Sequence, residues 1–74
     1  MRSSMDYVVV IEKLDDGSFS AHVPDLPGCV TSGDSVDEVR ILIKEAVTMH
    51  IDPLRRHEET VPAPATTIHI IHAA

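Results

Sequence analysis

Cysteine is almost absent from this sequence, since Cys29 is the only one among 74 residues. A single cysteine cannot form a disulfide within the chain, and the N-terminus lacks an apolar export segment. We therefore expect a reducing, cytoplasmic setting. A domain this short buries only about 60% of the surface that its unfolded chain exposes, so its own core gives marginal stability. With no disulfide available, we expect a homodimer or homotetramer to supply the rest.

Positive charge and aromatic side chains are also scarce. The chain has 6 Lys and Arg against 12 Asp and Glu, a formal net charge of −6, and Tyr7 and Phe19 are its only Phe, Tyr or Trp residues. Binding to phosphate backbones needs clustered Lys and Arg, and single-strand binding needs aromatic stacking platforms. We therefore expect no direct nucleic-acid binding. The missing run of about 20 apolar residues also argues against a membrane span.

The acidic and histidine side chains do not form a pattern typical of catalysis or metal binding. Two-metal nuclease chemistry needs several carboxylates that converge on ions about 4 Å apart, whereas most acids here fall in expected turns or along an expected helix. The sequence contains neither a CxxC nor an HExxH motif, and His69 and His72 would point to opposite faces of a strand. We therefore expect no enzymatic activity, no cofactor and no metal.

The first part of the chain is predicted to form a β-hairpin. Residues 6–14, DYVVVIEKL, are rich in β-branched side chains, and Asp15-Asp16-Gly17 supplies a turn signal. In residues 18–23, SFSAHV, polar and apolar side chains alternate, which is the period of a half-buried strand. That strand would direct three apolar residues toward a core: Phe19, Ala21 and Val23.

The stretch VPDLPGC, residues 23–29, interrupts this strand-forming region. Pro24 cannot donate to a sheet ladder, so the second strand must end there or lie at an edge. Pro27 and Gly28 form a turn pair in which Gly28 can adopt a positive φ without steric cost. Cys29 has no visible positive neighbour that would activate its thiol, and it is predicted to be a small buried apolar residue.

A short third strand, residues 29–32, is predicted to lead into one helix. Ser35 with Glu38 three residues later matches a capping box, in which the Ser side chain accepts from a first-turn N–H. Apolar residues and one histidine then recur at helical spacing: Val39, Leu42, Ile43, Ala46, Val47, His50, Ile51 and Leu54. Because Pro53 lacks an N–H and clashes with the preceding turn, we expect the regular helix to stop or kink near Asp52.

The C-terminal residues are predicted to form a last strand after a proline-rich connector at residues 60–65. Residues 66–72, TTIHIIH, have strand composition with isoleucine on both faces, so this strand should be covered on both sides or paired with another chain. We expect three isoleucines in the oligomer interface: Ile68, Ile70 and Ile71. We also expect residues 1–5 to be a disordered tail and residues 6–74 to be a single domain.

The motif PDLPGC directly after a strand, followed by T-x-GD-S before a helix, resembles the HicB-like antitoxin family. The resemblance covers residues 6 to about 52 and continues more faintly into the last strand. The motif loop consists of Pro24, Asp25, Leu26, Pro27, Gly28 and Cys29. The resemblance implies an α+β, partial RNase H-like fold of order β-β-β-α-β, with an antiparallel three-stranded sheet backed by one helix plus a C-terminal strand.

The same resemblance implies a function in a toxin-antitoxin system. It implies that the protein binds and neutralises a HicA-like toxin, a small basic protein of double-stranded-RNA-binding-domain-like fold that cleaves mRNA using a histidine. Many family members also carry a C-terminal DNA-binding domain, but this sequence ends at Ala74, soon after the last expected strand. We therefore expect no dedicated operator-binding domain.

Two functions remain open at this point. The first is an antitoxin whose acidic turns attract a basic toxin, and the residues expected to bind this partner are Asp15, Asp16 and Asp25. The second is a solitary oligomeric domain that binds a ligand or has a structural role without a toxin. A small basic protein encoded beside this chain would favour the first.

Overall fold

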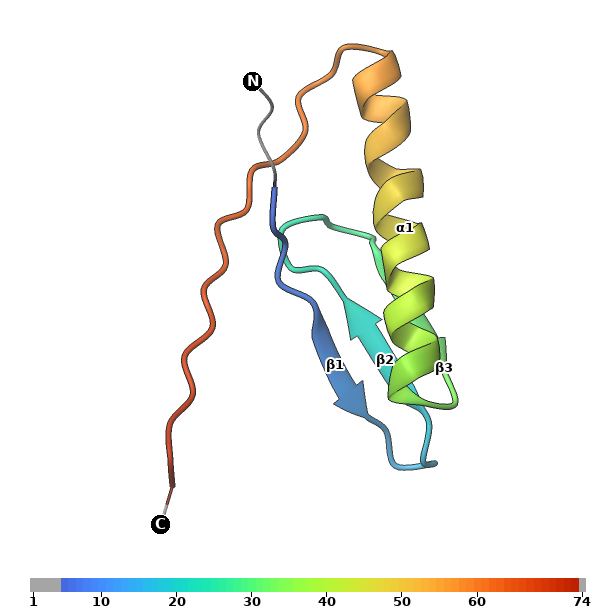
Figure 1. Cartoon of the computed structure of the whole chain (residues 1–74), viewed down its shortest axis with the longest axis vertical. Coiled ribbons are helices and arrows are strands. Elements are labelled where there is room, and N and C mark those ends of the chain that lie inside the picture. The colour runs from blue at the N-terminus through green and yellow to red at the C-terminus, as the bar shows by residue number, and fades with distance from the viewer. Residues whose placement is uncertain (1–4, 74) are drawn as a thin grey trace.

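The computed structural model describes residues 5–73 and contains three antiparallel strands followed by one helix (Figure 1). These elements are β1 (Val10–Lys13), β2 (Phe19–His22), β3 (Val30–Gly33) and α1 (Val36–Arg56). The sheet order is β1-β2-β3, and α1 covers one of its faces. The predicted α+β fold with a three-stranded antiparallel sheet backed by one helix is therefore confirmed.

The hairpin between β1 and β2 closes at the predicted turn. Val10 lies opposite His22 and Lys13 lies opposite Phe19 in the antiparallel ladder. The Leu14 N–H donates to the Ser18 carbonyl at 2.8 Å. The intervening glycine has a φ of 89°, a left-handed conformation that glycine adopts without steric cost.

Seven buried residues form the core between the sheet and α1: Ala21, Val23, Leu26, Cys29, Val39, Ile43 and Ile51. The predicted inward positions Ala21 and Val23 are confirmed, and Phe19 is half-buried beside them. Cys29 is buried as expected, and burial raises the pKa of its thiol, which keeps the thiol in its unreactive protonated form.

The start of α1 has the predicted cap. The Ser35 hydroxyl accepts from the Glu38 N–H at 3.1 Å, and the Glu38 carboxylate accepts from the Asp34 N–H at 2.6 Å. The carboxylate thus bonds one residue before the N-cap, rather than the N-cap itself as in a standard capping box. A Cβ on Gly33 would lie 2.6 Å from Glu38 Oε1, so glycine leaves the space that this arrangement needs.

The end of α1 corrects one prediction, because the helix continues through Pro53 to Arg56. Proline has no backbone N–H, so position 53 cannot donate the helical hydrogen bond to the carbonyl four residues earlier. The turn that contains Pro53 buries Ile51 and half-buries Leu54, and the Pro53 carbonyl accepts from the His57 N–H at 3.1 Å. Apolar packing and this terminal bond therefore offset the missing donor.

The predicted C-terminal strand is absent among the described residues, which is a second correction. After α1 the chain runs back along the body and then extends away from it (Figure 1). A β-strand needs a neighbouring strand for its backbone N–H and C=O groups, and no such neighbour lies beside residues 67–73 within the described part of this single chain.

Two further expectations concern the chain ends and membranes. Except for Met5, the tail expected at residues 1–5 lies outside the described residues. Within residues 5–73, no helix has both the length and the apolar composition needed to cross a membrane.

Candidate protein-binding site

The motif loop folds back on itself between β2 and β3. The Val23 N–H donates to the Cys29 carbonyl at 3.1 Å, which joins the two ends of the loop. Inside it, the Leu26 N–H donates to the Val23 carbonyl and the Cys29 N–H donates to the Leu26 carbonyl, both at 3.0 Å. The Leu26 side chain is 0% exposed, and Gly28 has a φ of 86°. The motif therefore builds a closed, internally hydrogen-bonded loop with its leucine in the core.

This closed loop presents Asp25 to the C-terminal segment. One carboxylate oxygen accepts from the Ala65 and Thr66 N–H groups at 3.0 and 3.1 Å, and the other accepts from the Thr66 hydroxyl at 3.0 Å. The bond from the Ala65 N–H is the main cause that lowers the pKa of Asp25, and Thr66 adds to it. Asp25 thus holds a segment that lies 40 residues away in the sequence.

Two more contacts hold the same segment on the body. The Tyr7 hydroxyl donates to the Pro62 carbonyl, and Val61 packs against the core. Together with the Asp25 bonds, they hold residues 61–66 beside the start of β1 and the motif loop.

Beyond Thr66 these contacts end. We call residues 67–73 the C-terminal arm. Its three isoleucines are strongly exposed, with Ile68 at 65%, Ile70 at 88% and Ile71 at 77%. Within the described residues, no hydrogen bond joins the arm to the rest of the chain. The sequence predicted these isoleucines as interface residues, and the structure leaves them in solvent.

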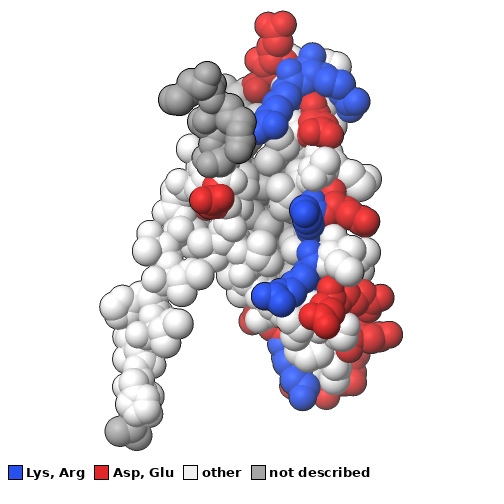
Figure 2. Space-filling view, in the orientation of Figure 1, with Lys and Arg blue, Asp and Glu red and all other residues white. Residues whose placement is uncertain are grey.

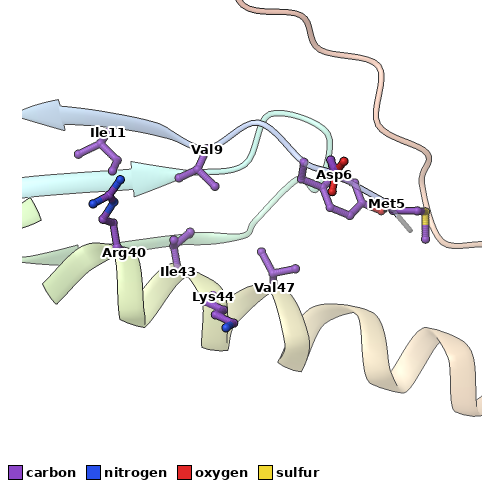
Figure 3. Close-up of a pocket in the computed structure, with 9 residues that line it drawn as sticks. Met5, Asp6, Val9, Ile11, Arg40, Ile43, Lys44 and Val47 are labelled. Atoms are coloured by element: carbon purple, nitrogen blue, oxygen red, sulfur yellow. Dashed lines mark hydrogen bonds between the residues drawn. The ribbon is translucent and has the colours of Figure 1, made fainter. Parts of the chain in front are cut away.

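An open groove of about 490 Å³ lies between β1 and α1, and we call it the β1–α1 groove. Four aliphatic side chains form its floor: Val9, Ile11, Ile43 and Val47. Figure 3 shows the pair from the β1 side and the pair from α1 pointing toward one another. Arg40 and Lys44 from α1 also line it, with Asp6 near one end. The groove is therefore apolar inside with charged groups at its margin.

The sheet face opposite α1 carries a second apolar feature. Val10, His22 and Val30 lie side by side across the three strands. Val30 is 64% exposed and His22 is half-buried. We call these three residues the open-face row. A row of this kind offers apolar contact area on either side of one imidazole.

The three acidic residues expected to bind a partner are not brought together. Asp15 and Asp16 lie in the turn between β1 and β2, whereas Asp25 lies in the loop at the other end of β2 (Figure 1). Asp16 accepts from the Ser18 N–H at 2.9 Å and from its hydroxyl at 2.5 Å, which lowers the Asp16 pKa. Only Asp15 and Asp16 form a shared acidic tip.

Sequence reasoning missed Tyr7 and the β1 side of the groove. The helical spacing did identify Ile43 and Val47, and the run of valines before β1 could have suggested that Val9 faces the same core. Nothing in the sequence indicated that Tyr7 contacts Pro62, because that contact depends on where the chain returns after α1.

A metal centre is not formed within the part of the chain that the structure describes. No three His, Cys, Asp or Glu side chains among residues 5–73 lie close enough together to hold an ion. The arrangement offers instead an apolar groove, two valines flanking His22 on the open sheet face, and an arm with three exposed isoleucines. Exposed apolar groups of this kind are features of protein–protein contact.

A small antiparallel sheet covered by one helix, with a closed loop after the second strand, defines a class of small α+β domain. The sequence model described as HicB_like antitoxin of bacterial toxin-antitoxin system matches residues 7–74. The chain therefore belongs to the HicB-like antitoxin family.

Individual relatives support the same conclusion. UPF0150 protein Ta0767 of Thermoplasma acidophilum is 43% identical over 68 residues, which cover 88% of this chain and 99% of the relative. The uncharacterized 14.9 kDa protein in the rep-hol intergenic region of Haemophilus phage HP1 is 40% identical over 58 residues. These cover 78% of this chain but only 43% of the phage protein, so the chain spans less than half of that relative.

A solved structure has the same fold. The crystal structure of the N-terminal domain of Burkholderia pseudomallei antitoxin HicB matches with a TM-score of 0.70 and 27% sequence identity. The match covers 80% of this chain and 69% of that domain. The fold observed here is therefore like that of the HicB N-terminal domain.

Proposed function

We propose that this protein is an antitoxin that binds and neutralises a HicA-like, mRNA-cleaving toxin. The family match across residues 7–74 carries the proposal. The solved structure of similar fold, which is titled as part of an antitoxin HicB, adds to it. On this proposal the protein is not an enzyme and acts on a protein rather than on nucleic acid. Its place is the cytoplasm, where mRNA is available to the toxin.

The proposed binding combines attraction by charge with apolar contact. The net charge of −6 would steer a basic toxin toward the protein, while buried apolar contacts would set how long the complex lasts. Asp15 and Asp16 are exposed at the tip of the hairpin, and the open-face row, at the opposite end of β1 and β2, supplies apolar area. Asp25 would contribute indirectly, because its carboxylate already holds residues 65 and 66.

Co-expression tests this proposal directly. The candidate partner is a small basic protein encoded by a gene adjacent to that of this chain, where the genome carries one; it is produced alone and together with this chain, and growth and co-purification are measured. We expect growth arrest by the basic protein alone, relief by this chain and a stable complex. Growth arrest that this chain fails to relieve, with no co-purified complex, would contradict the proposal.

The second candidate function is a solitary oligomeric binding or structural domain. The exposed isoleucines of the arm favour self-association in either case, and we infer a homodimer or homotetramer in solution. If the protein is a solitary domain, this assembly would form although no toxin is encoded beside the chain.

A further inference from the structure

The C-terminal arm lacks a partner strand in its own chain. Its sequence, TIHIIHA, is rich in β-branched residues, which favour extended, paired backbone. Residues 67–73 nevertheless make no hydrogen bond to the rest of the described chain. Exposed isoleucine on both faces and unpaired backbone groups together favour addition to the edge of a sheet.

The β1–α1 groove lies at such an edge. Because the sheet order is β1-β2-β3, β1 has a neighbour on one side only, and its other side borders the groove (Figure 3). A strand added along β1 would direct every second side chain toward α1. These side chains would enter the space lined by Val9, Ile11, Ile43 and Val47.

The arm has the side-chain pattern that this position requires. Ile68 and Ile70 are two residues apart, so they lie on one face of an extended strand and could both enter the groove. Ile71 would then lie on the opposite face, beside Val10 in the open-face row. Isoleucine on both faces, which is unusual for an exposed segment, has a contact on each side in this arrangement.

The arm leaves the groove of its own chain open. Asp25 fixes the chain at Thr66, and from there the arm extends away from the body (Figure 1). The charge of the arm is compatible with a second copy as the recipient. Residues 60–74 contain no Asp, Glu, Lys or Arg, and Figure 2 shows charged side chains gathered over α1 while the arm has none. An uncharged arm therefore adds no like-charge repulsion at the contact with a second acidic body.

We infer that the C-terminal arm adds to β1 of a second copy of this chain and places Ile68 and Ile70 in the β1–α1 groove of that copy. If both copies exchange arms, the contact closes as a two-fold dimer in which each chain gives one arm and receives one. The inference gives the proposed homo-oligomer its contact surface, and it does not depend on a toxin.

The test uses two defective variants of the full chain that should complement each other. The arm variant carries Ile68→Lys and Ile70→Lys. The groove variant carries Val9→Lys, with Val47→Lys as a second groove variant in case the first fails to fold by circular dichroism. Masses are measured by light scattering after size exclusion at micromolar concentration. Ile41→Lys is the control, because Ile41 is as exposed as Ile68, at 63% against 65%, and does not line the groove.

We expect the wild-type chain and the Ile41→Lys control to form the same oligomer, and the arm and groove variants each to be monomeric. Mixing the two variants should restore a species of twice the monomer mass, since the intact arm of one fits the intact groove of the other. A monomeric wild-type chain would overturn the inference. An oligomer that persists in the arm variant would also overturn it, while leaving both the assembly and the antitoxin proposal standing.

Discussion

At the scale of single residues, Asp25 connects the motif loop to the C-terminal segment. Its two carboxylate oxygens accept three hydrogen bonds from Ala65 and Thr66. Hydrogen bonds to an ionised carboxylate are stronger than those between neutral groups. A loop residue that the sequence suggested for partner binding therefore has a local structural role, namely to fix the point where the arm begins.

Replacing Asp25 with Ala should release this segment. The amide hydrogens of Ala65 and Thr66 would lose their acceptor, so we expect their exchange with solvent to become roughly as fast as in an unstructured chain. Hydrogen exchange measured by NMR checks this, with Asp15→Ala as the control because Asp15 is exposed in the hairpin turn. Unchanged protection at these two amides would contradict the role assigned to Asp25.

The same contact should respond to acid. The bonds from Ala65 and Thr66 lower the pKa of Asp25 below its ordinary value of 3.8. The stabilisation from an acid whose pKa is lowered on folding is complete above its ordinary value and is lost as the pH falls through the lowered value. We therefore expect the segment to stay in place at neutral and mildly acidic pH and to be released only below about pH 4. An NMR titration of the Thr66 amide measures this, and release between about pH 5 and 7 would implicate a histidine instead.

Gly33 and Glu38 should be energetically coupled. An Ala side chain at Gly33 would displace the Glu38 carboxylate from the Asp34 N–H, so we expect Gly33→Ala to lower the free energy of unfolding by about 1 kcal/mol. In a Glu38→Ala background the same change should be neutral or slightly stabilising, because Ala restricts the unfolded chain more than Gly. A double-mutant cycle by urea denaturation measures the coupling. Equal effects in both backgrounds would contradict it.

At the scale of elements, the sequence correctly predicted the features that are set by local sequence pattern. It failed for the features that depend on contacts between residues far apart in the chain. The alternation in β2, the Ser35 cap and the α1 apolar spacing are local and were confirmed. The prediction that α1 would stop near Asp52 was wrong, because the packing of Ile51 and Leu54 outweighs the low helix propensity of Pro53. The C-terminal strand was wrong within one chain because strand composition cannot supply a neighbour. The contacts of Asp25 lie 40 residues apart, and no local signal predicts them.

Replacing Pro53 tests how the low helix propensity of proline is balanced by apolar packing at the end of α1. Replacing it with Ala restores a backbone N–H in the helix interior and removes the ring clash. We expect the free energy of unfolding to rise by about 1–3 kcal/mol, measured by urea denaturation at equal protein concentration because assembly also adds stability. Ala46→Gly, in the middle of the same helix, should change it by about 1 kcal/mol in the opposite direction. A less stable Pro53→Ala protein would mean that the proline ring itself packs favourably.

At the scale of the whole molecule, charge and apolar surface are divided between different parts of the chain. The acidic tip of the hairpin and the charged surface of α1 lie on the body, while the arm is uncharged (Figure 2). Long-range attraction of a basic partner would act through the body, whereas contact between copies would act through the arm and the β1–α1 groove. The two proposed interactions can therefore be tested separately.

The acidic tip should affect how fast a toxin associates more than how long it stays bound. We expect the double change Asp15→Asn and Asp16→Asn to lower the association rate constant several-fold at low salt, with little change in the dissociation rate. Asn at position 16 keeps a side-chain oxygen for the Ser18 N–H, so the turn should be retained. At 0.1 M salt the difference should shrink, since charges are screened beyond ~10 Å. Surface plasmon resonance with the co-purified basic protein measures both rates, and Asp52→Asn near the far end of α1 is the control. A faster dissociation with an unchanged association rate would instead place these two residues inside the toxin contact.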